Sequence, residues 1–289
     1  MISLVVNADA GGRIMVFERD GINPIYENPE QNGLLLEDYI KLGFDPDGGR
    51  FDYGQERFTS DKHSLTFMGK WQAEVLSDYS LKLSSASDYT LGILSTRTFE
   101  LDPKSPCLRI IQTMKNISSK PTNYFFWGRT LVKPEGKLIM PVNPESSLPG
   151  QWGRYIWGDP EQFLIDEHDK GVCLKDGIFS LIPLNAENEK YGTDSKEGWM
   201  AYGYKSILFV KKYDYIPDAE YGELYGLTNI FYTNKQFAEM EPISALARLS
   251  PEEEFNYTED WYLLNYPECE SNNFDPKVCS EYLLNMIKN

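Results

Sequence analysis

A dense succession of short extended segments between Trp71 and Val132 limits the folds that are open to this chain. Pro, Ser and Asp residues separate the segments. Short segments punctuated at this density indicate an all-β sandwich or a related barrel rather than alternating β and α units. The five segments are WQAEVLS, SLKLSS, TLGILSTRTFEL, CLRIIQTMKNIS and TNYFFWGRTLV.

The N-terminal part of the chain predicts a hairpin meander. Its first two strands are expected at Ile2 to Val6 and Arg13 to Glu18, with a turn at Gly11 and Gly12 between them and a third short strand after them. The Asp20-Gly21 pair before the third strand is a strong signal for a two-residue hairpin turn. The following apolar stretch, Leu34 to Gly43, is compatible with a short helix or with a buried extended piece.

The sequence predicts one large β domain. With 289 residues the chain can bury a sizeable core, and sandwiches of this length occur as single units. No repeat or linker divides it, so we expect a single domain over residues 1–264 and a tail with a helix over residues 265–289. Asp275 as N-cap and Pro276 in the first turn begin that helix. We expect it to pack on the outside of the sheet, with an apolar face formed by Val278, Tyr282 and Met286.

The charge of the chain restricts its partners. Asp and Glu number 44 against 28 Lys and Arg, which gives a formal net charge of −16. This charge repels nucleic acids and anionic membranes and favours a neutral or cationic ligand, although acidity is also a common setting for solubility. No apolar run has the length of a membrane span, and the N-terminus lacks a signal-peptide pattern. We therefore expect a soluble protein without membrane insertion, cytoplasmic unless an export signal was removed.

The cysteine pattern argues against a metal site. Cys107, Cys173, Cys269 and Cys279 form no CxxC pair and have no clustered His beside them. Cys269 and Cys279 flank a polar turn and are compatible with a disulfide in an exported protein or with free thiols in the cytoplasm. The stretch from Phe44 to Phe58, FDPDGGRFDYGQERF, reads as a loop, but its acids lack the spacing of a calcium loop. We expect no metal and no cofactor.

The segment QFAEMEP, inside the long β-rich stretch from Gly198 to Leu264, predicts a pair of carboxylates on one strand face. Alternation puts Glu239 and Glu241 on one side, with Phe237, and Ala238 and Met240 on the other. The aromatic neighbour favours a partly enclosed face, where the two acids lie in a cleft. The alternative is a solvated sheet surface.

Further residues of the sequence are candidates for ligand binding. Arg50, on a glycine-supported loop, could donate paired hydrogen bonds to sugar hydroxyls or satisfy loop carbonyls. Trp127 and Arg129 share a strand face, which is either a ligand wall or an arginine stacked on an indole. Trp152 lies in a Pro- and Gly-rich stretch predicted to be mostly loop and hairpin, where binding residues concentrate. The polar residues around His63, like those around His168, are typical of a solvated turn. We retain His63 only as a binding candidate.

Three pieces of the sequence resemble a known family. They are GGRIMVFERDGIN, MKNISSKPTNYFFWGRTLV and FAEMEPISALARLSPEEEFNYTEDWYLL. They are similar to a bacterial branch of the galactose mutarotase-like, or aldose 1-epimerase-like, superfamily, where a GGRI strand, an N-S-x-x-P turn and a Glu strand followed by L-x-P-G-E and W-x-L recur. The resemblance spans nearly the whole chain through β-typical motifs. It implies a β-supersandwich with a short C-terminal helix and a sugar-binding concave face.

The resemblance also implies a chemistry. Aldose 1-epimerases open the pyranose ring with a glutamate that takes the anomeric hydroxyl proton and a histidine that protonates the ring oxygen. Glu241 best matches that base by its position before LSPEE, where Glu253 replaces the usual Gly, and Glu239 is the second candidate. Enclosure beside another acid would raise the pKa of such a carboxyl toward the working range. The family histidine lies about six residues beyond the proline, and counting from Pro121 places Trp127 there.

Two functions follow from these expectations. The first is an aldose 1-epimerase-like enzyme that uses Glu241 as base and an electrophilic group from Arg50, Arg129 or Lys212. The second is a non-catalytic carbohydrate-binding module with aromatic stacking, because the histidine acid is missing. A purely structural domain is a third alternative. For either function we expect a neutral mono- or oligosaccharide partner, and the binding candidates are Arg50, Trp127, Arg129, Trp152, Lys212 and His63.

Overall fold

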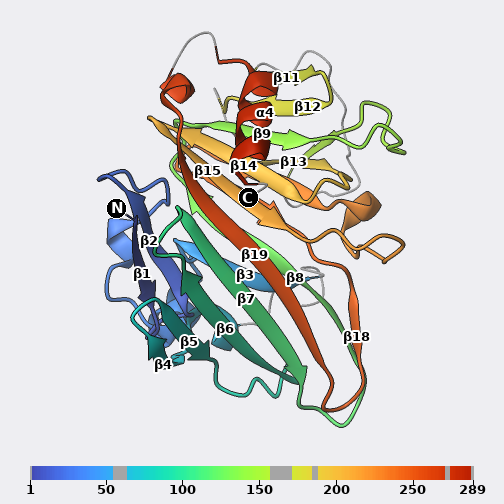
Figure 1. The fold of residues 1–289 in the computed structure, drawn as a ribbon. Coiled ribbons are helices and arrows are strands. Elements are labelled where there is room, and N and C mark those ends of the chain that lie inside the picture. Colours follow the sequence, from blue (N-terminus) through green and yellow to red (C-terminus); the bar gives the residue numbers. More distant parts are fainter. Residues whose placement is uncertain (1, 55–63, 157–170, 184–187, 271–273, 288–289) are drawn as a thin grey trace.

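The computed structural model describes residues 2–54, 64–156, 171–183, 188–270 and 274–287. Within these ranges the regular structure is mostly extended, and two large antiparallel sheets form a sandwich with one short helix near the C-terminus (Figure 1). This confirms the predicted all-β supersandwich. None of the described helices is long and apolar enough to cross a membrane.

The first sheet brings the N-terminal strands beside strands from the middle and the end of the chain. Among the described residues it has nine strands, and every pairing in it is antiparallel. The spatial order is β1 (Ile2–Asn7), β2 (Arg13–Arg19), β3 (Gly49–Gly54), β8 (Thr122–Val132), β17 (Ala238–Pro242), β16 (Asn229–Thr233), β13 (Glu189–Thr193) and β10 (Gly153–Ile156), and β18 (Ala247–Leu249) pairs with β8.

The second sheet has ten strands in the described part of the chain, and it is also antiparallel throughout. Its centre is the long strand β19, which runs between β15 and β7. The spatial order is β11 (Val172–Lys175), β12 (Ile178–Leu181), β9 (Lys137–Pro141), β14 (Trp199–Tyr204), β15 (Ile207–Tyr213), β19 (Glu254–Asn265), β7 (Cys107–Asn116), β6 (Ile93–Leu101), β5 (Ser80–Ser84) and β4 (Gln72–Ser77).

The main apolar core lies between the two sheets, because alternate residues of each strand point inward. Aromatic side chains dominate its centre. The rings of Phe51 and Phe126, from the first sheet, meet edge to face with centroids 5.1 Å apart. The rings of Phe209 and Trp261, from the second sheet, do the same at 5.1 Å. Aromatic side chains of both sheets therefore fill the centre of this core.

Strand β3 corrects one prediction. Its residues Gly49–Gly54 fall inside the stretch expected to be a loop, yet they pair with β8 on one side and contact β2 on the other. Gly49 explains how a Gly- and Asp-rich segment enters the sheet. A Cβ on Gly49 would lie 2.9 Å from the Trp261 ring, so only glycine permits this close approach of the two sheets. Phe51 and Tyr53 point to the core, so Asp52 between them points to the opposite face.

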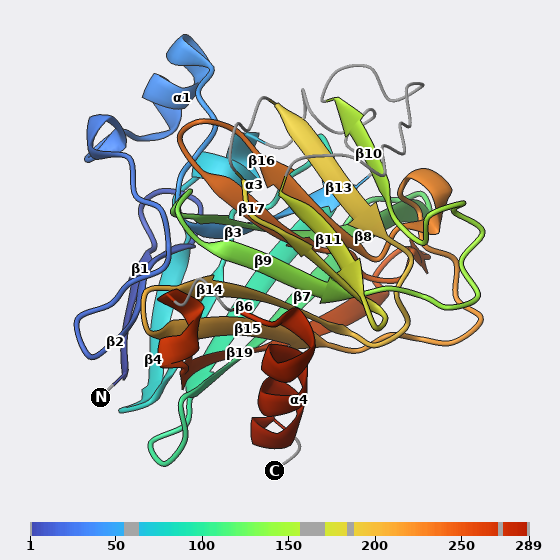
Figure 2. The same ribbon diagram turned by 90° about the horizontal axis from the view of Figure 1, so that it is seen from above.

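Helix α4 (Pro276–Met286) begins at the predicted N-cap, where Asp275 accepts hydrogen bonds from the backbone of Lys277 and Val278. It packs on the outer face of the second sheet, as Figure 2 shows. The predicted apolar face is correct only for Tyr282, which packs against the buried cluster. Val278 and Met286 are about half exposed, whereas Cys279 and Leu283 are buried. Cys279 and Leu283 are four residues apart, so they lie on the same side of the helix, which faces the sheet.

The remaining helices are short. Leu34 to Gly43 contains α1 (Leu36–Leu42), so of its two interpretations the helix is present, although none of its residues is buried. The other helices of the described residues are α3 (Ser64–Met68), η1 (Pro29–Gln31), η2 (Leu224–Gly226) and η3 (Pro267–Glu270). Cys269 and Cys279 both lie in the buried cluster under α4 as free thiols.

Candidate functional site

The two glutamates of β17 lie on the face of the first sheet that points away from the main core. Ala238 and Met240 belong to that core, so alternation along β17 places Glu239 and Glu241 on the opposite face. Both glutamates are completely buried. The alternative of a solvated sheet surface is therefore excluded. Buried carboxyl groups need partners, and the neighbouring strands supply them.

Glu241 is held by donors from β8 and β13. Its Oε2 accepts hydrogen bonds from Trp127 Nε1 at 2.8 Å and from Lys190 Nζ at 3.2 Å. Its Oε1 is buried and has no hydrogen-bond partner in the described part of the chain. The two donors fix the carboxylate through one oxygen and leave the other oxygen with its acceptor capacity unused.

Trp127 is a hydrogen-bond donor in this arrangement. Its side chain is buried, the ammonium of Lys190 lies 4.2 Å from its ring centroid, and the guanidinium of Arg129 lies 5.5 Å from it. The Arg129 contact realises the predicted stack of an arginine on an indole. Leu148 and Leu227, from two loops, pack in the same apolar cluster as Trp127. The indole thus orients Glu241 and supports the apolar cover of this half of the face.

Glu239 forms a bidentate ion pair with Arg129 of β8. Arg129 Nε donates to Oε2 at 3.0 Å and Nη2 donates to Oε1 at 3.2 Å. Burial raises the pKa of Glu239 to about 7; the charge of Arg129 opposes this shift, and the carboxyl groups of Asp45 and Glu241 add to it. Burial thus outweighs the ion pair with Arg129 in setting the pKa of Glu239.

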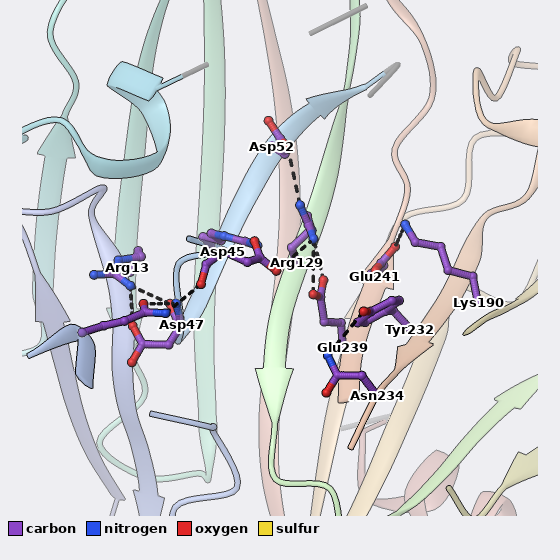
Figure 3. A network of polar contacts seen from close by, with 12 residues as sticks. Arg13, Asp45, Asp47, Asp52, Arg129, Lys190, Tyr232, Asn234, Glu239 and Glu241 are labelled. Atoms are coloured by element: carbon purple, nitrogen blue, oxygen red, sulfur yellow. Dashed lines mark hydrogen bonds and ion pairs between the residues drawn. The ribbon is translucent and has the colours of Figure 1, made fainter. Parts of the chain in front are cut away.

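Asp45, Asp52 and Arg50 complete the polar cluster, which Figure 3 shows in part. Arg129 Nη2 is 3.5 Å from Asp45 Oδ2, and Arg129 Nη1 is 3.9 Å from Asp52 Oδ2. Arg50 forms a short ion pair with Asp45. Partial burial opposes ionisation of Asp45, but the charges of Arg50 and Arg129 outweigh it and hold its pKa below the ordinary value.

Solved structures of known proteins share this architecture. A galactose mutarotase-like protein from Lactobacillus casei superposes with a TM-score of 0.58 at 11% sequence identity, over 91% of this chain and 100% of that chain. This chain has the galactose mutarotase-like fold.

Two further structures agree with this assignment. A galactose mutarotase-like protein from Clostridium acetobutylicum gives a TM-score of 0.59 at 10% identity, over 91% of this chain and 93% of that one. A galactose mutarotase related enzyme from Lactobacillus acidophilus gives 0.53 at 10% identity, over 92% and 98%. No protein-family model and no curated protein matches the sequence. At these identities the comparisons establish the fold of the chain, which the sequence resemblance had implied.

Within the galactose mutarotase-like fold, two of the predicted binding residues contact the glutamates, and a third contacts Asp45 beside them. Trp127 and Arg129 reach them from β8, and Arg50 reaches Asp45 from β3. Arg50 also lies over the Phe67 ring at 4.8 Å, and it bonds a carboxylate rather than the loop carbonyls that were one alternative. Its Nε and Nη1 atoms are buried without hydrogen-bond partners in the described part of the chain.

Two predicted binding residues lie elsewhere. Trp152 is buried in the core between the sheets, where its ring centroid is 5.2 Å from that of Phe179. Lys212 belongs to β15 of the second sheet, and its ammonium contacts the carbonyl of Ile287 at 3.5 Å. Neither joins the cluster around Glu241, because the one faces the core and the other the outer side of the sandwich. His63 lies outside the described residues.

Lys190 and Asp45 belong to the site but were not candidates. Lys190 sits in EKYGT, where a lone lysine on a short strand gives no sign of its partner. In the register Lys190 lies opposite Tyr232 of β16, which lies opposite Glu239, so its side chain reaches Glu241 diagonally, two residues further along β17. Asp45 belongs to the Asp-rich stretch from Phe44 to Phe58, and nothing in that pattern indicates its contact with Arg129. Among the described residues, no group of His, Cys, Asp and Glu side chains is arranged to hold a metal ion.

A second polar group supports β17 from the core side. Lys211 Nζ, completely buried on β15, donates to the carbonyl of Met240 at 3.2 Å and lies 3.4 Å from Glu259 Oε2. Glu259 also accepts from Trp261 Nε1 at 2.8 Å. Burial lowers the pKa of Lys211 to about 8, and the charge of Glu259 opposes the shift. The peptide group between the two site glutamates is thus anchored to the second sheet.

Proposed function

We propose that this protein binds a neutral mono- or oligosaccharide at the face that carries Glu239 and Glu241, and that it acts on the anomeric centre with Glu241 as base. The observation that carries the proposal is that Oε1 of Glu241 accepts no hydrogen bond in the described part of the chain. Trp127 and Lys190 occupy the other oxygen, so the carboxylate is oriented and can accept the proton of an anomeric hydroxyl at Oε1. The galactose mutarotase-like fold is consistent with this role.

Ligand entry sets a structural requirement. Glu241 is completely buried in this structure, so a sugar reaches Oε1 only if side chains above the sheet face move. Loop residues such as Leu148 and Leu227 contribute to the apolar cluster beside Trp127. Loops change conformation at lower free-energy cost than strands, so displacement of this cover is compatible with an intact sandwich.

The second candidate function is a non-catalytic carbohydrate-binding module. The observation that favours it is the identity of residue 127, because an indole N–H lacks the acidity of the family's histidine. In this function Glu239, Glu241 and Arg50 bind hydroxyl groups without proton transfer.

Polarimetry on freshly dissolved galactose and glucose separates the two functions. We expect the wild type to accelerate mutarotation above the buffer rate, and Glu241→Gln to reduce that acceleration at least about 100-fold, because the amide cannot serve as base. Glu74→Gln makes the same chemical change on the exposed strand β4 and should leave the rate unaltered. Sugar binding without acceleration by the wild type supports the module, and acceleration unchanged in Glu241→Gln removes Glu241 from the mechanism.

A further inference from the structure

Lys190 brings a cation onto the face that carries the two glutamates. Tyr191, its neighbour on β13, belongs to the core, so alternation points Lys190 to the opposite face. The side chain of Lys190 is buried, and its Nζ donates to Oε2 of Glu241 at 3.2 Å, as Figure 3 shows. The same ammonium lies 4.2 Å from the ring centroid of Trp127. A proton donor thus lies directly beside the carboxylate that we propose as base.

Opening of a sugar ring needs an acid as well as a base, because the ring oxygen must take a proton when its bond to C1 breaks. In the described part of the chain two side chains donate to Glu241, and they differ in what they can release. Trp127 has a neutral indole N–H that serves only as a hydrogen-bond donor. Lys190 has an ammonium with three N–H groups, which becomes a neutral amine when it loses one proton.

The ion pair on the neighbouring part of the face is less suited to this role. Arg129 is a cation, but a guanidinium keeps its protons in proteins, and its Nε and Nη2 donate to Glu239. Both oxygens of Glu239 are therefore acceptors in this arrangement. Of the groups that contact the two glutamates, the Lys190 ammonium is the one that combines a donor geometry with a proton it can release.

We propose that Lys190 is the general acid of this site and gives a proton to the ring oxygen of the sugar while Glu241 takes the proton of the anomeric hydroxyl. This inference rests on the proposed function. The anomeric oxygen and the ring oxygen are both bonded to C1, so the acid and the base must lie close together. The hydrogen bond between Lys190 and Glu241 Oε2 holds them in this way and leaves Oε1 for the anomeric hydroxyl.

The proton transfers balance. Glu241 Oε1 takes the proton of the anomeric hydroxyl, and the O–H electron pair becomes the second bond of the C1 carbonyl. The bond from C1 to the ring oxygen breaks, and its electron pair stays on that oxygen, which takes a proton from the Lys190 ammonium. Rotation about the bond from C1 to C2 and the reverse transfers close the other anomer. The carboxylate and the ammonium then recover their first protonation states.

Burial favours transfer of both protons in one step. Lys190 is 2% exposed and Glu241 is not exposed at all. Deprotonation of Lys190 alone would leave a buried carboxylate without its counterion, at a high cost in free energy. Because Glu241 gains a proton as Lys190 loses one, the pair passes from one cation and one anion to two neutral groups. The net charge of the buried site therefore stays the same throughout the reaction.

The first test compares two cations at position 190. Lys190→Arg keeps the positive charge and the N–H donors for Glu241, but a guanidinium does not release a proton. We expect this variant to unfold at the urea concentration of the wild type and to lose at least about 100-fold in mutarotation rate. Lys190→Met removes the charge as well and should lose both stability and activity. Lys120→Arg makes the conservative change at an exposed lysine and should alter neither.

The second test locates the ammonium with unreactive ligands of the wild type. The 1,5-anhydro derivatives of galactose and glucose lack the anomeric hydroxyl but keep the ring oxygen, whereas their carbocyclic analogues have a methylene group in its place. Calorimetric titration should show about 10-fold tighter binding of an anhydro sugar than of its carbocyclic analogue, because a hydrogen bond from a charged donor is lost in the analogue. Lys190→Met should lose this preference.

The outcomes separate this inference from the proposed function. If the wild type does not accelerate mutarotation, the proposed function fails and the inference fails with it. If the wild type accelerates mutarotation and folded Lys190→Arg keeps the rate, the proposed function stands and Lys190 is not the acid. If Lys190→Arg does not fold, the titrations decide, since equal affinity of the wild type for the anhydro sugar and its carbocyclic analogue overturns the inference.

Discussion

Hydrogen bonds to one oxygen fix the orientation of the buried Glu241 carboxylate. Its two oxygens are chemically equivalent in water, but here one accepts from an indole and an ammonium and the other accepts from neither. Removal of one donor would leave a buried charge with less compensation, which costs more free energy than the lost hydrogen bond itself. We therefore expect the free energy of unfolding to depend on the partners of each glutamate.

Lys190→Met tests the ion pair of Glu241. We expect the free energy of unfolding to fall by about 3–5 kcal/mol, because the variant removes the counterion of a fully buried carboxylate. Urea unfolding followed by fluorescence measures the change. Lys120→Met, which removes an exposed lysine, should change stability by no more than about 0.5 kcal/mol. Equal effects of the two substitutions would show that the Lys190 contact is unimportant for folding.

Glu239 should make stability depend on pH. Its pKa is raised from 4.5 to about 7 in the folded protein, so the folded state binds the proton more tightly than the unfolded state. The resulting stabilisation is complete below about 4.5 and is lost as the pH rises through about 7, with an amplitude of up to about 3 kcal/mol. Urea unfolding across this range measures the slope. Glu239→Gln should remove it, and a slope that persists in this variant would assign it to other groups.

At the scale of elements, strand β17 separates two environments. Its odd-numbered residues, Glu239 and Glu241, face the polar cluster, and its even-numbered residues, Ala238 and Met240, face the core. Lys211 binds the Met240 carbonyl from the core side. Both faces of the strand are thus restrained by charged groups.

The Lys211–Glu259 pair can be tested by a double-mutant cycle. Lys211→Met should destabilise the fold by about 3–5 kcal/mol, because Glu259 stays buried without its cation. Adding Glu259→Gln should recover part of the loss, with a coupling energy of about 0.5–3 kcal/mol. Urea unfolding of the four proteins gives this energy. The exposed neighbour Lys212 provides the control, and additive effects at 211 and 259 would argue against a direct pair.

At the scale of the whole molecule, the sandwich gathers the site from distant parts of the chain. Trp127 and Glu241 are 114 residues apart in sequence and 2.8 Å apart at their hydrogen-bonding atoms. Lys190 is 51 residues from the same carboxylate. Because the cluster exists only when β3, β8, β13 and β17 are assembled in one sheet, a ligand that contacts it must stabilise the folded state as a whole.

Sugar binding should therefore raise the melting temperature. A monosaccharide at about 100 times its dissociation constant stabilises the native state by about 2.7 kcal/mol, which corresponds to a rise of a few degrees for a chain of this length. Differential scanning fluorimetry with a panel of sugars measures the rise. Equal concentrations of an acyclic polyol correct for the general stabilisation that sugars give as osmolytes. A panel in which no sugar exceeds the polyol would contradict both proposed functions.

The sequence by itself determined the features that depend on local pattern. Alternation in QFAEMEP predicted which residues of β17 share a face, turn-forming residues predicted the all-β class, and Asp275 with Pro276 predicted the start of α4. These properties follow from backbone geometry and from neighbours a few residues away, which a sequence displays directly.

Only the tertiary structure decided which side chains meet. It gave Glu241 the partner Lys190, brought Asp45 and Glu239 to the same guanidinium of Arg129, and placed β3, a predicted loop, in the sheet. The tertiary structure also placed Trp152 in the core between the two sheets. Contacts across strands depend on the order and register of the whole sheet, and burial against a neighbouring sheet selects among faces that look equivalent along the chain.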